Sequence, residues 1–259
     1  MFAEERQQEI AAIIAERGHI SIAEIIEKYG VSGESARRDL RALEQAHQCK
    51  RTHGGAVQVQ QVGMRPPLDR NYDTMPIDPR YDRIAAQAVT LIRPGDTVYL
   101  TGGSFGYLLL RHLPTELKCT LVVNNVDLAN RLRAFPQADV YLAGGLMRKS
   151  GSVVDSMARE FMSRLHFDLA LLTGSGFTAD FGLSNGTDET AALQRQVIRN
   201  SRRSVVLMPS GKVGADAFVK VCDAADFDLL ITDWDCVEDE LNAIRDRGVS
   251  VMIAAEAEA

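Results

Sequence analysis

The sequence predicts a protein of two domains, a small helical domain with a β-hairpin followed by an α/β domain with a largely parallel sheet. The chain has 259 residues, which exceeds the usual size of roughly 100 to 200 residues for one domain. Apolar residues recur at helical spacing near the N-terminus, whereas the later sequence alternates short apolar runs with helical patterns. We therefore expect a first domain at residues 1–59, a linker at 60–80 and a second domain at 81–256.

Composition excludes several classes of protein. Hydrophobic residues make up 46% of the chain and charged residues 25%, as in ordinary globular proteins. No apolar run of about 18 residues occurs and the first residues are charged, so we expect a cytoplasmic protein without membrane contact. The four cysteines form no C-x-x-C pair, which argues against a disulfide framework, a zinc knuckle or a redox motif. We expect them to be reduced thiols.

Three short helices are expected in the first domain. Residues 4–17 place isoleucines on one face of an amphipathic helix. After a short extended step at residues 20–22, Ser21 is a suitable N-cap for a second helix, which Gly30 ends. Ser32 is a suitable N-cap for the third helix. The three helices with a tight glycine turn predict a helix-turn-helix unit.

A β-hairpin is expected after the third helix. Residues 49–59 contain two short runs on either side of Gly54 and Gly55, a pattern typical of two strands joined by a tight turn. A hairpin at this position forms the wing of a winged helix-turn-helix domain.

The local charge of this region favours DNA as a partner. The whole chain carries a net charge of −6, but residues 31–59 hold five basic and three acidic residues. A major groove about 12 Å wide accepts one helix, and arginines, serines and backbone amides near its N-terminus meet phosphates and base edges. The expected DNA-binding residues are Ser32, Gly33, Glu34, Ser35, Arg37, Arg38, Arg41, Arg51, His53, Gly54 and Gly55.

Two other interpretations apply to the charges on the third helix. They would also occur on a helix whose polar face is merely solvated, although the three helices and the basic wing favour DNA binding. We expect Asp39, beside two arginines, to orient them or to close an ion pair within the domain rather than to contact DNA.

The same residues resemble a known family. The run VSGESARRDL at residues 31–40 and the run RTHGGA at residues 51–56 are similar to the signature of DeoR-family bacterial transcription regulators. The family pattern has Thr-Ile before Arg-Arg-Asp-Leu, where this chain has Ser35 and Ala36. The resemblance implies a DNA-binding winged helix-turn-helix domain.

The second domain is expected to alternate between strands and helices. Its linker contains four prolines and shows no sustained periodicity. The expected helices are 81–92, 105–113, 126–134, 155–165, 188–200 and 237–246, and the expected strands are 97–101, 119–124, 138–143, 167–173, 203–208, 218–222, 228–232 and 249–253. Such alternation predicts a largely parallel sheet with helices on both faces.

Glycine-rich loops follow five of the expected strands. In open α/β sheets ligands bind beyond the carboxyl ends of the strands, and glycines let backbone amides approach an anion at a helix N-terminus. The expected effector-binding residues are Gly102, Gly103, Ser104, Phe105, Asn125, Gly144, Gly145, Gly174 and Lys212. Each glycine pair alone is also typical of a tight turn from strand to helix. Neither a Rossmann fingerprint nor a Walker A loop fits the chain.

The second domain also resembles the DeoR family. Its order of strands and glycine loops is similar to that of the family's effector domain, which has a ribose-5-phosphate isomerase-like fold and generally senses a phosphorylated sugar or a related metabolite. The chain departs from the family pattern at Thr101 and Pro209, where the family has carboxylates, and at Gln194, where a lysine is common. The lost carboxylates are strong acceptors for sugar hydroxyls. We therefore expect a phosphorylated metabolite that differs from a typical sugar phosphate.

These observations predict a transcription regulator, a repressor of a carbohydrate or related metabolic operon, and not an enzyme. No catalytic set, metal-ligand spacing or cofactor motif is present. A homodimer or higher homo-oligomer is expected, because one winged module makes few contacts with double-stranded operator DNA. The first alternative is a sugar-phosphate isomerase-like enzyme with a fused helix-turn-helix domain. The second is an interaction module whose winged helix binds protein.

Overall fold

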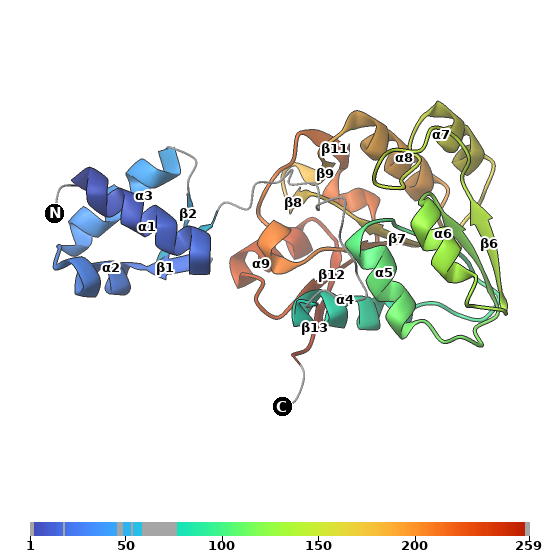
Figure 1. Ribbon diagram of the computed structural model, residues 1–259, viewed down its shortest axis with the longest axis horizontal. Coiled ribbons are helices and arrows are strands. Elements are labelled where there is room, and N and C mark those ends of the chain that lie inside the picture. Colours follow the sequence, from blue (N-terminus) through green and yellow to red (C-terminus); the bar gives the residue numbers. More distant parts are fainter. Residues whose placement is uncertain (1–2, 18, 46–48, 53, 59–76, 257–259) are drawn as a thin grey trace. The chain divides into compact units, whose positions relative to one another are not determined.

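The computed structural model describes residues 3–17, 19–45, 49–52, 54–58 and 77–256. The chain divides into two compact units, Met1–Gln61 and Val62–Ala259 (Figure 1). Each unit has its own hydrophobic core.

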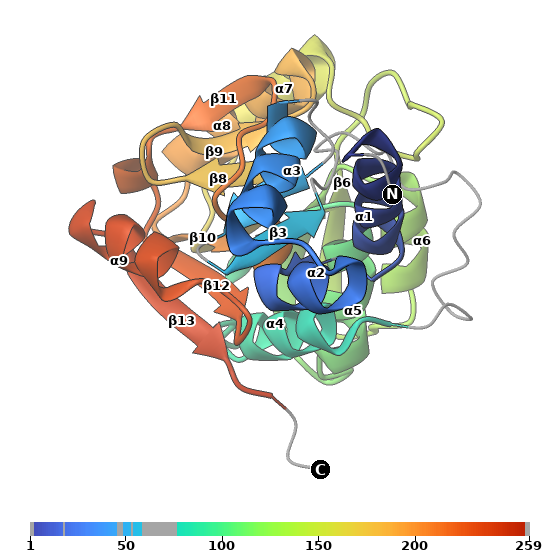
Figure 2. The same cartoon turned by 90° about the vertical axis from the view of Figure 1, so that its left-hand side faces the viewer.

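The first unit is a winged helix-turn-helix fold, as the sequence predicts. Its helices are α1 (Ala3–Arg17), α2 (Ile22–Tyr29) and α3 (Gly33–Gln45), and its strands are β1 (His19–Ser21), β2 (Cys49–Thr52) and β3 (Gly55–Gln58). The strands form an antiparallel sheet in the order β1-β3-β2. Helix α3 packs against both α1 and α2, and the three helices are seen together in Figure 2.

Local signals set the ends of these helices. The hydroxyl of Ser21 accepts a hydrogen bond from the backbone N–H of Glu24 at 3.2 Å, and the carboxylate of Glu24 accepts one from the backbone N–H of Ser21 at 2.7 Å. This capping box satisfies two amides that a helix start leaves free. Gly30 ends α2 with φ 64°, a left-handed conformation that favours glycine. The expected extended step was wrong at Ile22, which is already helical.

The second unit contains a seven-stranded sheet. Its strands are β4 (Thr97–Leu100), β5 (Cys119–Val123), β6 (Ala138–Leu142), β7 (Leu169–Thr173), β10 (Ser204–Leu207), β12 (Leu229–Asp233) and β13 (Ser250–Ala254). Their order is β13-β12-β10-β7-β4-β5-β6, and all neighbours are parallel. This confirms the predicted parallel sheet.

Helices cover both faces of this sheet (Figure 1). The helices are α4 (Pro79–Val89), α5 (Ser104–His112), α6 (Val126–Leu132), α7 (Ser156–Ser163), α8 (Asp188–Arg199) and α9 (Glu238–Asp246). Alternate residues of one strand serve opposite faces, because side chains alternate along a strand. Val98 and Leu100 pack with residues of α4, α5 and α6, whereas Tyr99 packs with residues of α7, α8 and α9.

Two details differ from the sequence-based expectations. Helix α4 begins at Pro79, inside the segment assigned to the linker, because Asp78 caps it and proline fits the first helical position. A small antiparallel sheet in the order β11-β9-β8 adds two strands that were not expected, β8 (Gly176–Thr178) and β9 (Gly182–Asn185). The expected strand at 218–222 is β11 (Val219–Cys222) and belongs to this small sheet.

All four cysteines are free thiols. No helix among the described residues has the length and apolar character needed to cross a membrane.

Candidate functional site

The third helix presents a charged surface and buries an apolar one. Ala36, Leu40 and Leu43 lie in the core of the first unit. The side chains of Arg37 and Arg38 are exposed, and so is that of Arg41 further along the helix. Within the described residues no carboxylate pairs with any of these three arginines. Three unpaired guanidinium groups on one exposed helix can bind phosphates or base edges.

The start of α3 is fixed by a serine pair. The backbone N–H of Ser35 donates to the hydroxyl of Ser32 at 3.2 Å, and the hydroxyl of Ser32 donates to that of Ser35 at 3.1 Å. A Cβ added at Gly33 would lie 3.6 Å from both Arg37 and Ile26. Gly33 therefore sits where α2 and α3 approach each other. Glu34 is exposed in the first turn of α3.

Asp39 closes an ion pair within the first unit, which was one of the two expected roles. Its carboxylate accepts hydrogen bonds from Nε of Arg6 at 2.6 Å, from Nη2 of Arg6 at 3.2 Å and from the side chain of Gln7 at 3.0 Å. The hydrogen bond to Asp39 raises the pKa of Arg6. Asp39 is 2% exposed, so it is not placed to contact DNA.

The wing residues differ from one another in what they can contact. Arg51 is exposed but already pairs with Glu44, with Nε of Arg51 2.8 Å from the carboxylate. Gly54 is exposed, and its carbonyl accepts a hydrogen bond from the backbone N–H of Ile22 at 2.8 Å. Gly55 is buried, because β1 passes directly beside it. His53 lies outside the described residues.

The parallel sheet brings the predicted loops to one edge. The paired registers place the ends of β10, β7, β4, β5 and β6 at a common level, so the loops that follow them share the carboxyl edge. We call the loop at Gly102–Ser104 together with Lys212 the carboxyl-edge site. The residues Gly102–Ser104 follow strand β4, and Lys212 lies in the loop after strand β10.

Helix α5 has no side-chain cap at its N-terminus. Gly103 occupies the N-cap with φ 76° and makes no side-chain cap bond. By contrast, α4, α6, α7 and α8 are capped by Asp78, Asn125, Asp155 and Thr187. A Cβ added at Gly103 would meet no atom within 4 Å. The first amides of α5 and the hydroxyl of Ser104 therefore suit an anion.

Lys212 supplies a positive charge at the same edge of the sheet as this helix start. Its Nζ donates to the carbonyl of Gly174 at 3.3 Å, so the side chain crosses from the loop after β10 to the loop after β7. Strand β7 is the direct neighbour of β4, and neighbouring strands lie about 4.8 Å apart. No carboxylate pairs with Lys212 among the described residues. Burial lowers the pKa of Lys212, because a desolvated ammonium group without a counterion is disfavoured.

Several predicted effector residues have structural roles. The ring of Phe105 is 2% exposed and stacks on Tyr81 in the core, so only the backbone of this residue is left to contact a ligand. The side chain of Asn125 caps α6 and donates to the carbonyl of Ser150. A Cβ added at Gly145 would lie 2.3 Å from Asp155.

The two remaining glycines differ in their surroundings. Gly144 is exposed, and a Cβ there would meet no atom within 4 Å. Gly174 is buried, and a Cβ there would lie 2.5 Å from Leu183. The structure therefore leaves Gly144 accessible, whereas Gly174 contributes its carbonyl to Lys212.

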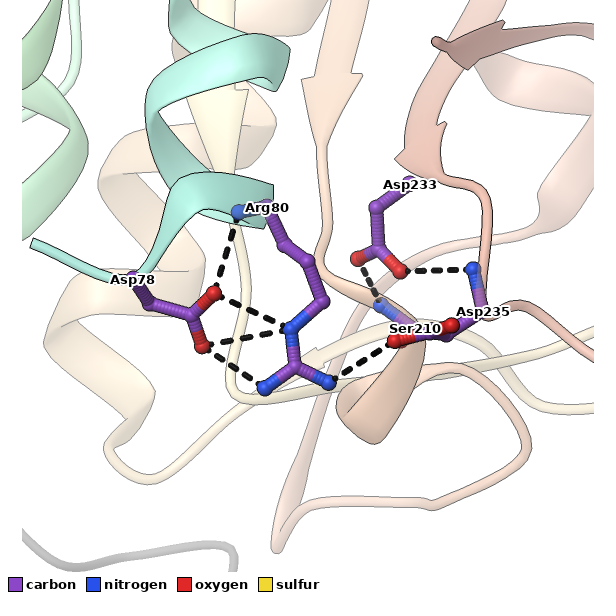
Figure 3. A network of polar contacts seen from close by, with 5 residues as sticks. All are labelled: Asp78, Arg80, Ser210, Asp233 and Asp235. Carbon is purple, nitrogen blue, oxygen red and sulfur yellow. Dashed lines mark hydrogen bonds and ion pairs between the residues drawn. The ribbon is translucent and has the colours of Figure 1, made fainter. Parts of the chain in front are cut away.

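Sequence reasoning missed two polar networks at the carboxyl edge. In the first, Gln194 donates to the carbonyl of Thr173 at 2.7 Å and accepts from Asn185. In the second, the buried carboxylate of Asp233 accepts from the backbone N–H groups of Ser210 and Asp235 (Figure 3). The signal that could have revealed the second network was the aspartate at the end of β12, two residues after the apolar run Leu229–Ile231.

The second network also includes the first turn of α4. Asp78 accepts hydrogen bonds from Nε and Nη2 of Arg80, and Nη1 of Arg80 donates to Asp235 at 3.3 Å (Figure 3). Hydrogen bonding to Asp78 raises the pKa of Arg80, and nearby Asp233 and Asp235 act in the same direction. The hydrogen bonds from the Arg80 side chain lower the pKa of Asp78.

The described residues contain no group of three or more His, Cys, Asp or Glu side chains that could hold a metal ion. An open groove of about 400 Å³ lies between α7 and α8. None of the carboxyl-edge loops lines it, and its walls are exposed or half-buried side chains, all of them polar except Ala192. The glycine loops therefore remain the better candidate for an effector site.

Each of the two units matches a domain of a known protein family. Residues 6–62 match the model of the DeoR-like helix-turn-helix domain, and residues 80–234 match that of the DeoR C-terminal sensor domain. A regulator from Bacillus subtilis, the uncharacterized HTH-type transcriptional regulator YulB, is 29% identical over 252 residues, covering 97% of this chain and 96% of that protein.

Two further proteins are similar over most of the chain. The glycerol-3-phosphate regulon repressor of Escherichia coli is 26% identical over 230 residues, covering 88% of this chain and 90% of the repressor. Among solved structures, the sorbitol operon regulator SorC of Klebsiella pneumoniae is 14% identical with a TM-score of 0.41, covering 92% of this chain and 97% of SorC. Since the matched domains together span most of the sequence, the chain belongs to the DeoR family of transcription regulators.

Proposed function

We propose that this DeoR-family regulator is a repressor of a carbohydrate or related metabolic operon, and that a phosphorylated metabolite at the carboxyl-edge site changes its affinity for operator DNA. The observation that carries the DNA-binding part is the exposure of Arg37, Arg38 and Arg41 on α3, without carboxylate partners among the described residues. The name of the Escherichia coli relative, a glycerol-3-phosphate regulon repressor, supports an operon of this kind.

Helix α3 has the geometry of a recognition helix. Ser32 caps the helix by accepting from the backbone N–H of Ser35 in the first turn, and the three arginines follow in the next turns. One side of the helix can therefore face the major groove while Leu40 remains in the core. The backbone N–H of Gly54 and the side chain of Arg51 lie on the wing. Phosphates are the contacts expected there. The protein acts in the compartment that holds its DNA.

The carboxyl-edge site suits a phosphate group. The uncapped amides of α5 and the hydroxyl of Ser104 supply donors, and Lys212 supplies a charge that nothing among the described residues neutralises. Phosphate is an anion with strong acceptor oxygens, so it would accept hydrogen bonds from the free amides of α5. Its negative charge would also favour the protonated form of the desolvated lysine.

The rest of the ligand is expected to differ from a typical sugar. Thr101 is 4% exposed and its hydroxyl donates to the carbonyl of Gly102, and Pro209 has no polar side chain. Neither position supplies the carboxylate that would bind sugar hydroxyls strongly. The same absence weighs against an isomerase, because proton abstraction needs a positioned base.

The active form is expected to be a homodimer or a higher homo-oligomer. One winged module makes few DNA contacts, and two modules on one assembly gain affinity through effective concentration. The effector unit is the expected place of association. Sedimentation velocity of the full chain would show a single monomeric species if this part of the proposal were wrong.

DNA binding is tested on the full chain by gel shift with duplex DNA that the chain itself selects from a random library. Arg37→Ala and Arg38→Ala are expected to weaken binding, whereas Arg199→Ala removes an exposed arginine of α8 and serves as the matched control. Unchanged affinity in both α3 variants would remove α3 from the interface. Retention that does not respond to salt would favour the protein-interaction alternative.

Effector binding is tested by thermal shift with a panel of phosphorylated metabolites that includes glycerol 3-phosphate and ribose 5-phosphate. A compound that binds the native state raises its apparent stability. Lys212→Met is expected to abolish the shift, whereas Lys149→Met removes an exposed lysine and is expected to preserve it. Turnover of ribose 5-phosphate in a coupled assay would instead support the enzyme alternative.

A further inference from the structure

A buried carboxylate joins the loop of Lys212 to the loop after β12. Asp233 is fully buried at the end of β12. One of its oxygens accepts from the backbone N–H of Ser210 at 2.7 Å, and the other accepts from the backbone N–H of Asp235 at 3.1 Å. Hydrogen bonds to a buried charged group are among the stronger ones in proteins. A displacement of the turn at Ser210–Lys212 would therefore be passed to Asp235.

The loop after β12 also touches the start of α4. The guanidinium of Arg80 is held on one side by Asp78, which caps the same helix, and its Nη1 reaches Asp235 at 3.3 Å on the other (Figure 3). The contact with Asp78 stays within one helix turn, so it does not constrain other elements. The contact with Asp235 joins residues 155 positions apart.

The two links differ in strength in a way that suits a switch. The carboxylate of Asp233 is fully buried, whereas Arg80 and Asp235 have side chains that are 40% and 52% exposed. Exposed ion pairs contribute little to stability, so this contact can break and re-form without unfolding its neighbours. Arg80 also keeps Asp78 as a partner when Asp235 moves away, and the exposed carboxylate of Asp235 is then solvated by water.

The position of α4 in the sequence gives this contact its significance. Among the described residues, α4 is the first helix of the sensor unit and the one nearest in sequence to the winged unit. We propose that the contact between Arg80 and Asp235 couples occupancy of the carboxyl-edge site to the first turn of α4, and thereby to DNA affinity. This inference rests on the proposed function, because it requires an anion at Lys212. Coupled sites typically change each other's affinity by about fivefold or more.

The experiment uses the full chain, a self-selected duplex and inorganic phosphate as the probe, with chloride at equal ionic strength as the reference. DNA affinity and thermal stability are both measured with and without phosphate. Asp235→Asn removes the carboxylate that faces Arg80 but keeps the backbone N–H that binds Asp233. Asp239→Asn makes the same change of charge at an exposed position of α9 and is the matched control.

The expected result separates binding from coupling. Phosphate changes the DNA affinity of the wild type and of Asp239→Asn by about fivefold or more, whereas Asp235→Asn is still stabilised by phosphate but its DNA affinity no longer responds. A response of Asp235→Asn equal to that of the wild type would overturn the coupling and leave the site intact, as would a wild type that phosphate stabilises without any change in DNA affinity. A wild type that phosphate neither stabilises nor changes in DNA affinity would overturn the proposed anion site itself.

Discussion

The carboxylate of Asp39 is bound by the guanidinium of Arg6, with Nε and Nη2 donating at 2.6 and 3.2 Å. Asp39 belongs to α3 and Arg6 to α1, so the pair fixes the third helix of the unit against the first. The acid directly follows the exposed Arg38 in sequence. Because α1 neutralises it, its charge does not weaken the positive surface of α3.

Replacement of Asp39 by Asn is expected to destabilise the first unit by about 3 kcal/mol, because it leaves the nearly buried guanidinium of Arg6 without a counterion. Hydrogen exchange of the amides of α1 and α3 in the full chain measures this loss locally. Glu27→Gln, at an exposed position of α2, should change protection little. Equal protection in the two variants would show that the pair contributes nothing.

The glycine pair of the wing provides a second test of packing. A Cβ at Gly55 would lie 2.1 Å from the carbonyl oxygen of Ile20 and 2.8 Å from Cα of Ser21, whereas one at Gly54 would meet nothing within 4 Å. Gly55→Ala is therefore expected to cost about 3 kcal/mol by forcing β1 and β3 apart, and Gly54→Ala is expected to be nearly neutral. Hydrogen exchange of the β1 and β3 amides checks both, and a neutral Gly55→Ala would contradict the close approach.

Local sequence signals predicted the parts of the fold that depend on neighbours in the chain. The N-cap at Ser32 and the end of α2 at Gly30 depend on residues within one turn, and both were predicted correctly. The common edge of the glycine loops followed from the parallel alternation of strands and helices. For these features the chain carries the relevant residues side by side.

Contacts between distant residues could not be predicted in this way. Arg6 and Asp39 are 33 positions apart, and Arg80 and Asp235 are 155 positions apart, so no periodicity links them. The glycine loop at residues 101–106 predicted an anion site but did not reveal that the ring of Phe105 turns into the core. Strands β8 and β9 are only three and four residues long, too short to show an alternation.

Arg38→Ala separates two ways in which α3 can bind DNA. If Arg38 contacts a base, the variant is expected to lose about 1 to 3 kcal/mol on the selected duplex and to discriminate less at one base pair. If it contacts a phosphate, binding weakens alike on all duplexes and the salt dependence falls by about one unit of slope. Gel-shift titrations of several duplexes at several salt concentrations distinguish the two. A variant with wild-type affinity and salt slope would exclude both roles.

Lys212 gives the proposed effector site a defined pH dependence. Burial lowers the pKa of Lys212 from its ordinary value of 10.5, whereas an anion needs the charged form. Affinity for a phosphorylated ligand is therefore expected to fall as pH rises through the lowered pKa, earlier than for an exposed lysine. The ligand does not cause this fall, because the second pKa of a phosphate monoester is about 6 and its negative charge only increases as pH rises.

The ligand-free protein should show the opposite trend in stability. The unfolded chain binds the Lys212 proton more tightly than the folded chain does, so the free energy of unfolding rises with pH between the lowered pKa and the ordinary one. Lys212→Arg keeps its charge over this range and is expected to remove both trends. Lys212→Met is expected to bind at least about tenfold more weakly at neutral pH, since hydrogen bonds to charged groups contribute about 1.5 to 3 kcal/mol.

Calorimetric titration of a phosphorylated ligand at several pH values measures the first trend, and urea unfolding of the ligand-free protein measures the second. Because Lys212→Arg shares every other titratable group with the wild type, the difference between their two profiles isolates the amino group. Parallel profiles for the two proteins would place the ligand away from Lys212 even if binding itself were confirmed. A wild-type affinity that falls with pH while that of Lys212→Arg stays level would place the ligand's charge beside the amino group of Lys212.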